Sequence, residues 1–276
     1  MDLIEHPIGL NSEIHHAIAE RVAWHTALVI NTVRQQTTLA TGQTASWEAV
    51  GSGSACRWKG KRFVLTAKHV LEEASARDIR FFLRSTGAID WGTRPSQPLI
   101  AQIVALEVED VVRCQYEDLA CIILGQNESG RHLEFADLPK DFGDVPPAGG
   151  GTLITGCPTD QSITVAEGYQ QGTHWRALAL QPRGCWAVVV DDPPRYFPSS
   201  FDSAKHFLLR YDPAEEGALP HGFSGSGVWY RRRRVDSLWA ADPVLAGVQV
   251  RWHGESKLMI AVRSEVVRQF LEESIR

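Results

Sequence analysis

Cysteine and long apolar runs are scarce in this chain. Its 276 residues include only five cysteines, an odd number, and none of them forms a C-x-x-C pair. This argues against a disulfide framework and against the usual zinc-binding patterns, and it favours free, buried thiols at Cys56, Cys114, Cys121, Cys157 and Cys185. No stretch approaches the about 18 consecutive apolar residues of a membrane-spanning helix, so we expect no membrane partner.

An excess of positive charge is also missing. Lysine and arginine together number 28 and aspartate and glutamate 33, which gives a formal net charge of −5. Domains dedicated to nucleic acids are usually basic, so we expect no nucleic-acid partner. Residues 1–20 lack the basic region, apolar core and small-residue cleavage site of a secretory signal. Together with the cysteine pattern, this predicts a cytoplasmic protein.

Short segments rich in Val, Ile, Phe, Trp and Thr fill most of the chain, with Gly, Pro, Asp and Asn between them. The expected strands of the first half are 24–32, 49–57, 62–66, 79–84, 99–108 and 118–124. Those of the second half are 152–156, 161–169, 173–180, 185–191, 206–211, 226–230, 244–252 and 257–262. Many short strands at near-regular spacing predict a β-sandwich or β-barrel protein.

Helical periodicity is found only near the two ends, over 12–22 and over 265–275, with Ser264 as a plausible N-cap of the second helix. A segment rich in Pro and Gly separates the two halves. We therefore expect an N-terminal arm over 1–23, a first barrel over 24–136, a linker over 137–151, and a second barrel with the terminal helix over 152–276.

One glycine-rich segment is a candidate for chemistry. Glycines flank Ser224 in the sequence GFSGSG over 222–227, where they allow a tight turn and leave the hydroxyl exposed. Serine needs a nearby base to attack an amide. His69 ends an apolar strand and precedes a short helical turn (LEEA), and Asp118 opens another apolar strand. Each feature alone is ordinary, because such a hexapeptide is usually a turn and a lone histidine is usually a surface or core residue.

The order His69, Asp118, Ser224 is that of the chymotrypsin triad. With their flanking residues, these segments resemble the chymotrypsin-like (trypsin-like) serine peptidases, in particular bacterial intracellular members. The matching segments are GSGS at 51–54 followed by VLTAKH at 64–69, DLA at 118–120, ITGCP at 154–158, GFSGSG at 222–227, and the strand over 244–252 that would line the substrate groove.

The resemblance implies an all-β fold of two antiparallel six-stranded barrels with N- and C-terminal helices. It implies that Ser224 is the nucleophile, His69 the general base and then acid, and Asp118 the carboxylate that orients the histidine. The backbone N–H groups of Gly222 and Ser224 would form the oxyanion hole. No metal and no cofactor are implied.

The chain also departs from the family pattern. Phe223 stands where secreted zymogens carry an aspartate for a newly cut N-terminus, so activation by clipping is not implied. The usual cysteine pair around the histidine is missing. Lys68 occupies a position that is commonly alanine, and we expect its side chain to point to solvent.

Five residues are candidates for the pocket that would bind the substrate side chain. Ala218 occupies the position where trypsin has an aspartate, which argues against cleavage after basic residues. Four further residues are candidates for the substrate pocket: His221, Val250, Arg251 and His253. The arginine and the histidines could bind an acidic side chain or could line the rim instead, and Ala218 equally permits a neutral apolar pocket.

Two other segments are predicted to lie at the surface. Arg231 to Arg234 follow an apolar strand and predict a solvated hairpin tip, with an acidic docking partner or a self-cleavage point as alternatives. Residues 192–203, rich in Pro and aromatic side chains, predict a surface loop near the groove.

The resemblance therefore predicts a serine endopeptidase that acts on a polypeptide, with one specific protein substrate and an activating partner left open. A regulated processing role, of the kind found in bacterial defence or signalling, would fit. One alternative is a catalytically silent fold that serves as a protein-binding module. The other is the core of an HtrA-type quality-control protease, although no PDZ-like extension follows the terminal helix.

Overall fold

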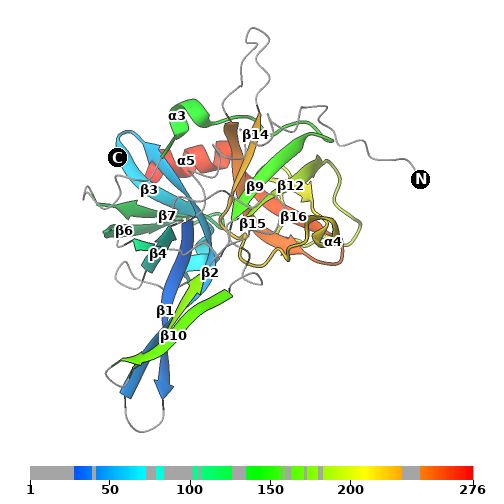
Figure 1. Cartoon of the computed structure of the whole chain (residues 1–276). Coiled ribbons are helices and arrows are strands. Elements are labelled where there is room, and N and C mark those ends of the chain that lie inside the picture. Colours follow the sequence, from blue (N-terminus) through cyan, green and yellow to red (C-terminus); the bar gives the residue numbers. More distant parts are fainter. Residues whose placement is uncertain are drawn as a thin grey trace.

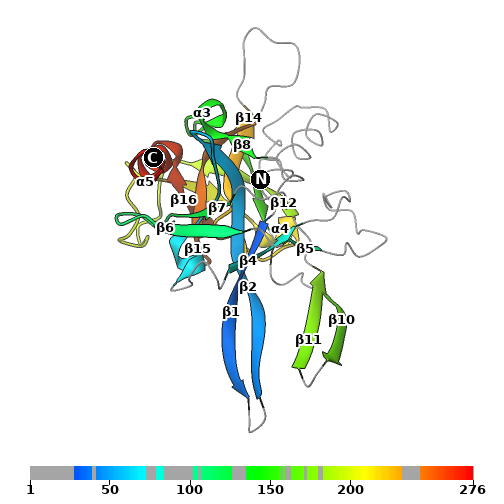
Figure 2. The ribbon, with the colours of Figure 1, turned by 90° about the vertical axis from the view of Figure 1, so that its left-hand side faces the viewer.

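The computed structural model describes eleven stretches of the chain, and all structural statements below concern these residues (Figures 1 and 2). They are 28–38, 42–72, 79–83, 102–104, 107–125, 135–156, 158, 163–170, 173–179, 183–231 and 243–275.

The second half of the chain contains a closed barrel of six strands. Its members are β9 (Gly151–Gly156), β12 (Arg183–Val190), β13 (His206–Arg210), β14 (Gly227–Arg231), β15 (Pro243–His253) and β16 (Leu258–Arg263). They pair in the order β12-β13-β16-β15-β14-β9 and close on themselves. The expected second barrel is therefore confirmed. The two other segments expected here form a separate hairpin, β10 (Ile163–Gln170) with β11 (Thr173–Ala179).

The barrel strand β16 is buried on both faces. Met259 and Ala261 belong to the apolar cluster inside the barrel. Leu258, Ile260 and Val262 alternate with them and belong to a second cluster outside it. Because successive side chains of a strand point to opposite faces, this continuous apolar run needs cover on the outside as well. The first half of the chain and the C-terminal helix supply that cover.

The first half forms an eight-stranded sheet instead of the expected six-stranded barrel. Its strands are β1 (Leu28–Thr38), β2 (Gly42–Trp58), β3 (Lys61–Thr66), β4 (Ile79–Leu83), β5 (Gln102–Val104), β6 (Val108–Arg113), β7 (Ala120–Leu124) and β8 (Ala136–Asp137). The pairing order is β5-β4-β1-β2-β3-β7-β6, with β8 beside β2, and no pairing among the described residues closes it.

Strand β2 is much longer than predicted and β1 continues past its predicted end, and this changes the shape of the first half. They pair as far as Thr38 and Gly42 and extend away from the body as a two-stranded arm (Figures 1 and 2). The additional residues are rich in Thr and Gln, so they lack the apolar alternation by which a strand is recognised in a sequence.

The expectation that helices occur only near the ends is wrong. Three single-turn helices lie within the chain, α2 (Lys68–Leu71), α3 (Leu138–Asp141) and α4 (Pro213–Glu216). The helical turn expected directly after His69 is α2, which begins earlier and contains His69. The expected linker over 137–151 thus begins with α3. Such one-turn helices are too short to produce a helical periodicity. The expected helix over 12–22 lies outside the described residues.

The C-terminal helix α5 (Ser264–Ser274) agrees with the sequence except at its start. Arg263 is the N-cap, and Ser264 is already helical. The Ser264 hydroxyl donates a hydrogen bond of 2.7 Å to the carbonyl of Gly143, so it joins α5 to the segment between the halves instead of capping the helix. Within the described stretches, no helix combines the length and apolar character that crossing a bilayer requires.

The two halves share one apolar core. A single buried cluster contains Leu65 and Ile122 from the first sheet, Ile260 from the barrel, and Phe270 and Leu271 from α5. In Figure 1, α5 lies between the first sheet and the barrel. Cys56, Cys114, Cys121 and Cys185 are buried free thiols, as expected, and Cys157 lies outside the described residues. The shared core holds the two halves together where the candidate site lies.

Candidate active site

The Ser224 segment is a tight turn at the start of β14. Gly222 and Gly225 have φ values of +97° and +89°, which side chains other than glycine rarely adopt. The Phe223 N–H donates to the carbonyl of Pro220, and the Ser226 N–H donates to the carbonyl of Phe223. Phe223 is fully buried. Ser224 is half-buried at the surface of the turn.

The first half of the chain holds this turn in place. The Ser52 N–H donates to the carbonyl of Ser224 at 2.8 Å, and the Ser52 hydroxyl donates to the carbonyl of Gly222 at 2.6 Å. Gly225 lies so close to the first sheet that a Cβ there would collide with Ser52 O and Thr66 Oγ1. The serine turn therefore packs against the end of β3, the strand that leads to His69.

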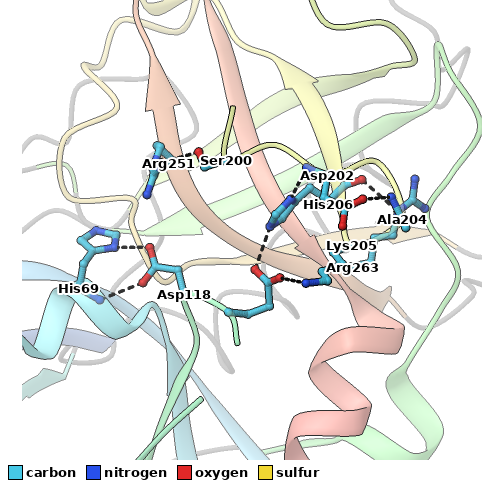
Figure 3. A network of polar contacts seen from close by, with 10 residues as sticks. His69, Asp118, Ser200, Asp202, Ala204, Lys205, His206, Arg251 and Arg263 are labelled. Atoms are coloured by element: carbon cyan, nitrogen blue, oxygen red, sulfur yellow. Dashed lines mark hydrogen bonds and ion pairs between the residues drawn. The ribbon is translucent and has the colours of Figure 1, made fainter. Parts of the chain in front are cut away.

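His69 and Asp118 form a two-point contact. The carboxylate of Asp118 accepts the backbone N–H of His69 at 3.0 Å on Oδ1 and contacts Nδ1 of the ring at 2.8 Å through Oδ2 (Figure 3). An ionised carboxylate can only accept hydrogen bonds, so Nδ1 carries the proton. The other ring nitrogen, Nε2, is then left as a base.

The charge state of Asp118 supports this assignment. Burial by itself would raise the pKa of the carboxyl, but three stabilising contributions outweigh it. They are the hydrogen bonds from the His69 ring and N–H, the electrostatic attraction of His69, and the charge of Arg251, and together they hold the pKa below its ordinary value. The Asp118 side chain is 21 % exposed and that of His69 is 48 % exposed, so the ring edge is open to an incoming molecule.

The third expected contact is not formed. Among the described residues, no hydrogen bond joins His69 to Ser224. In the same part of the chain, the N–H groups of Gly222 and Ser224 make no internal hydrogen bond. Two backbone donors next to the Ser224 hydroxyl are thus free to bind an external acceptor.

Lys68 does not point to solvent as expected. Its ammonium donates a hydrogen bond of 2.9 Å to the carbonyl of Cys114. That carbonyl precedes the turn carrying Asp118, and the Cys114 N–H in turn donates to Leu119 O across the same turn. Lys68 therefore braces the loop that carries Asp118.

A buried ion-pair cluster beside Asp118 was not predicted. Glu117 contacts His206 Nε2 at 3.0 Å and the Lys205 ammonium at 3.1 Å. The side chains of Glu117 and His206 are both 8 % exposed. The N–H of Asp202 donates to His206 Nδ1, which places the ring proton on Nε2, facing the glutamate. This cluster ties the Asp118 loop to strand β13 of the barrel (Figure 3).

A cavity of about 380 Å³ opens beside these groups, between the first sheet and the barrel. Asp118 and Lys68 line it from one side, and Val250 and Arg251 of β15 from the other. The Arg251 guanidinium donates to the Ser200 hydroxyl at 2.8 Å. The loop expected over 192–203 thus lies beside Arg251, as the sequence suggested.

The remaining pocket candidates lie elsewhere. Ala218 is buried and its carbonyl accepts the Tyr211 hydroxyl at 2.7 Å. His253 contacts Ser256 through Nδ1 and lies against the ring of Phe197. His221 is exposed. None of the three lines the cavity, so the residues proposed as one pocket do not all meet there. Of the arginine run, all but Arg231 lie outside the described residues.

Comparison with known proteins adds no family assignment. No protein-family model matches the chain, and no curated protein shows significant similarity to it.

Proposed function

We propose that this chain is a serine endopeptidase of the chymotrypsin-like family, with Ser224 as the nucleophile. The first sheet would correspond to the family's first barrel. The observation that carries the proposal is the two-point contact between Asp118 and His69, which leaves Nε2 of the ring as a base near the glycine-flanked turn of Ser224.

The proposed reaction proceeds through an acyl-enzyme. Ser224 Oγ attacks the carbonyl carbon of the scissile peptide bond while its proton passes to His69 Nε2. The oxyanion that forms is bound by the N–H groups of Gly222 and Ser224. His69 then gives the proton to the leaving amine as the C–N bond breaks. A water molecule repeats the sequence and releases the new carboxylate, and Asp118 stays ionised throughout.

One observation is also compatible with a second function. Because no hydrogen bond joins His69 to Ser224 among the described residues, the fold would also suit a catalytically silent protein-binding module. Catalytic hydrogen bonds in enzymes without substrate are often long and tighten only on binding, so we favour the peptidase.

A fluorophosphonate probe separates the two functions, since it reacts only with an activated serine. We expect labelling of the wild type and its loss in both Ser224→Ala and His69→Ala. Ser203→Ala, which removes an exposed serine of a surface loop, is the matched control and should be labelled like the wild type. Labelling that persists in Ser224→Ala contradicts the proposal. A folded wild type that is never labelled favours the binding module.

A further inference from the structure

The acidic side chains that line the cavity beside Asp118 each accept a hydrogen bond or form an ion pair within the protein. The Glu117 carboxylate is paired with Lys205 and His206. The Asp118 carboxylate is held by His69. Asp202, which is exposed, accepts the N–H of Ala204. These negative charges are therefore each bound to a donor of the protein itself.

Arg251 and Lys68, two positively charged side chains of the same cavity, donate to neutral groups instead of carboxylates. Arg251 donates to the hydroxyl of Ser200 and Lys68 to a backbone carbonyl, and both acceptors are neutral. Within the described stretches, neither side chain forms an ion pair with a carboxylate. A guanidinium has five N–H donors, and the bond to Ser200 uses one of them. Arg251 is exposed, so its remaining donors are available to a ligand.

The backbone next to Arg251 is also available. Strand β14 pairs with β15 only from Pro243 to Val248. Gln249 bonds to the serine turn, through Gly225 N–H and Ser226 O. From Arg251 to His253, β15 pairs with β16 alone among the described strands, and Val250 lies in a bulge just before this stretch. Its other edge begins directly beside the Ser224 turn, and an open strand edge of this kind accepts an extended peptide.

We propose that Arg251 binds the carboxylate of an acidic side chain in an extended polypeptide that lies along this edge, so that the site selects substrates with Asp or Glu close to the scissile bond. The inference rests on the proposed peptidase function and deepens it. Lys68, on the same cavity, adds positive charge, and the planar guanidinium suits a two-point contact with a carboxylate. His221 and His253 are not needed for this selection.

The test uses fluorogenic peptides in which each of the four positions before the scissile bond is in turn Glu, Gln or Lys. We expect one position at which the wild type prefers Glu to the isosteric Gln by about tenfold in kcat/KM. Arg251→Ala should abolish that preference, Arg251→Lys should keep part of it, and Arg251→Glu should favour Lys at the same position. Arg210→Ala removes an exposed arginine of β13 that does not line the cavity, and it should retain the wild-type preference.

Binding is measured in parallel on the Ser224→Ala protein, which needs no turnover. Fluorescence anisotropy with the same Glu and Gln peptides should show tighter binding of the Glu peptide, weakened by salt and lost when Arg251→Ala is added. If peptides are cut but Arg251→Ala leaves the Glu-to-Gln ratio unchanged, the inference is overturned and the peptidase stands. If the folded wild type cuts none of the peptides, the proposed peptidase function is overturned. The inference about Arg251 is then decided by binding alone, and equal binding of the Glu and Gln peptides overturns it.

Discussion

Ser52 holds the Ser224 turn by two hydrogen bonds, one from its backbone N–H to Ser224 O at 2.8 Å and one from its hydroxyl to Gly222 O at 2.6 Å. Ser52 belongs to the first sheet, and Ser224 to the turn that precedes barrel strand β14. The orientation of the turn that carries the candidate nucleophile is thus set by the other half of the chain.

Ser52→Ala should loosen this turn. The change removes the hydroxyl bond and keeps the backbone bond, so we expect the free energy of unfolding to fall by about 1 kcal/mol. The proposed peptidase activity should fall more than this loss of stability explains, because the proposed oxyanion donors, the N–H groups of Gly222 and Ser224, move with the turn. Chemical denaturation and kcat/KM are the measurements. Ser203→Ala, at an exposed serine, should change neither, and a Ser52→Ala enzyme with full activity would contradict the argument.

Gly225→Ala tests the close approach of the turn to the first sheet. Alanine there meets both an unfavourable φ and a collision with Ser52 O and Thr66 Oγ1, so we expect a loss of several kcal/mol or failure to fold. Gly149→Ala is the matched control, since its φ is +81° but nothing lies within 4 Å of the added Cβ. It should cost only the backbone strain, about 1 kcal/mol. Equal melting temperatures for the two variants would refute the packing argument.

Asp118→Asn should leave the fold intact and remove most of the activity. The amide can donate to His69 and favour the wrong ring tautomer, so we expect kcat to fall by about 10⁴, as in comparable triads. The kinetics with a cleavable peptide test this, and fluorophosphonate labelling should slow in parallel. Full labelling of the variant would show that Asp118 does not orient the base.

The Asp118 carboxyl also predicts a dependence of stability on pH. Its pKa is held below the ordinary value of 3.8 in the folded protein, so the unfolded chain takes up this proton first as the pH falls. The stability that the carboxylate contributes is fully present above pH 3.8 and is lost as the pH drops through the folded pKa. Denaturation of the wild type and of Asp118→Asn should therefore differ at neutral pH and converge in acid. A difference that does not change with pH would contradict this.

Glu117→Gln tests the buried ion-pair cluster. The substitution leaves Lys205 and His206 without their carboxylate, and we expect a loss of about 3 kcal/mol because one partner of a buried pair is removed. Lys257→Met, which breaks the exposed pair with Asp212, should cost much less, because water screens the attraction between two exposed charges. Thermal unfolding of both variants gives the comparison. A smaller effect at Glu117 than at Lys257 would show that the cluster does not tie the halves together.

The barrel was predicted because apolar strands repeat regularly in the second half of the sequence. The contact between His69 and Asp118 was predicted from the order of the two residues with Ser224 and from the family resemblance of their segments. The Glu117–His206 pair joins residues 89 positions apart, and neither stands in a motif, so only the folded chain reveals it. The polar strands of the arm were missed because they lack the apolar alternation of a typical strand. The donation from Ser264 to Gly143 was missed because it joins residues 121 positions apart.

The open edge of β15 has one more consequence. A peptide that adds to this edge would contact the barrel through its backbone, the Asp118 loop through its side chains, and the serine turn at its scissile bond. A bound substrate would then bridge the two halves, and its binding should slow amide hydrogen exchange in both of them. A short inhibitor confined to the serine turn would leave the edge of β15 unprotected, so exchange patterns distinguish compounds that lie along this edge from those that do not.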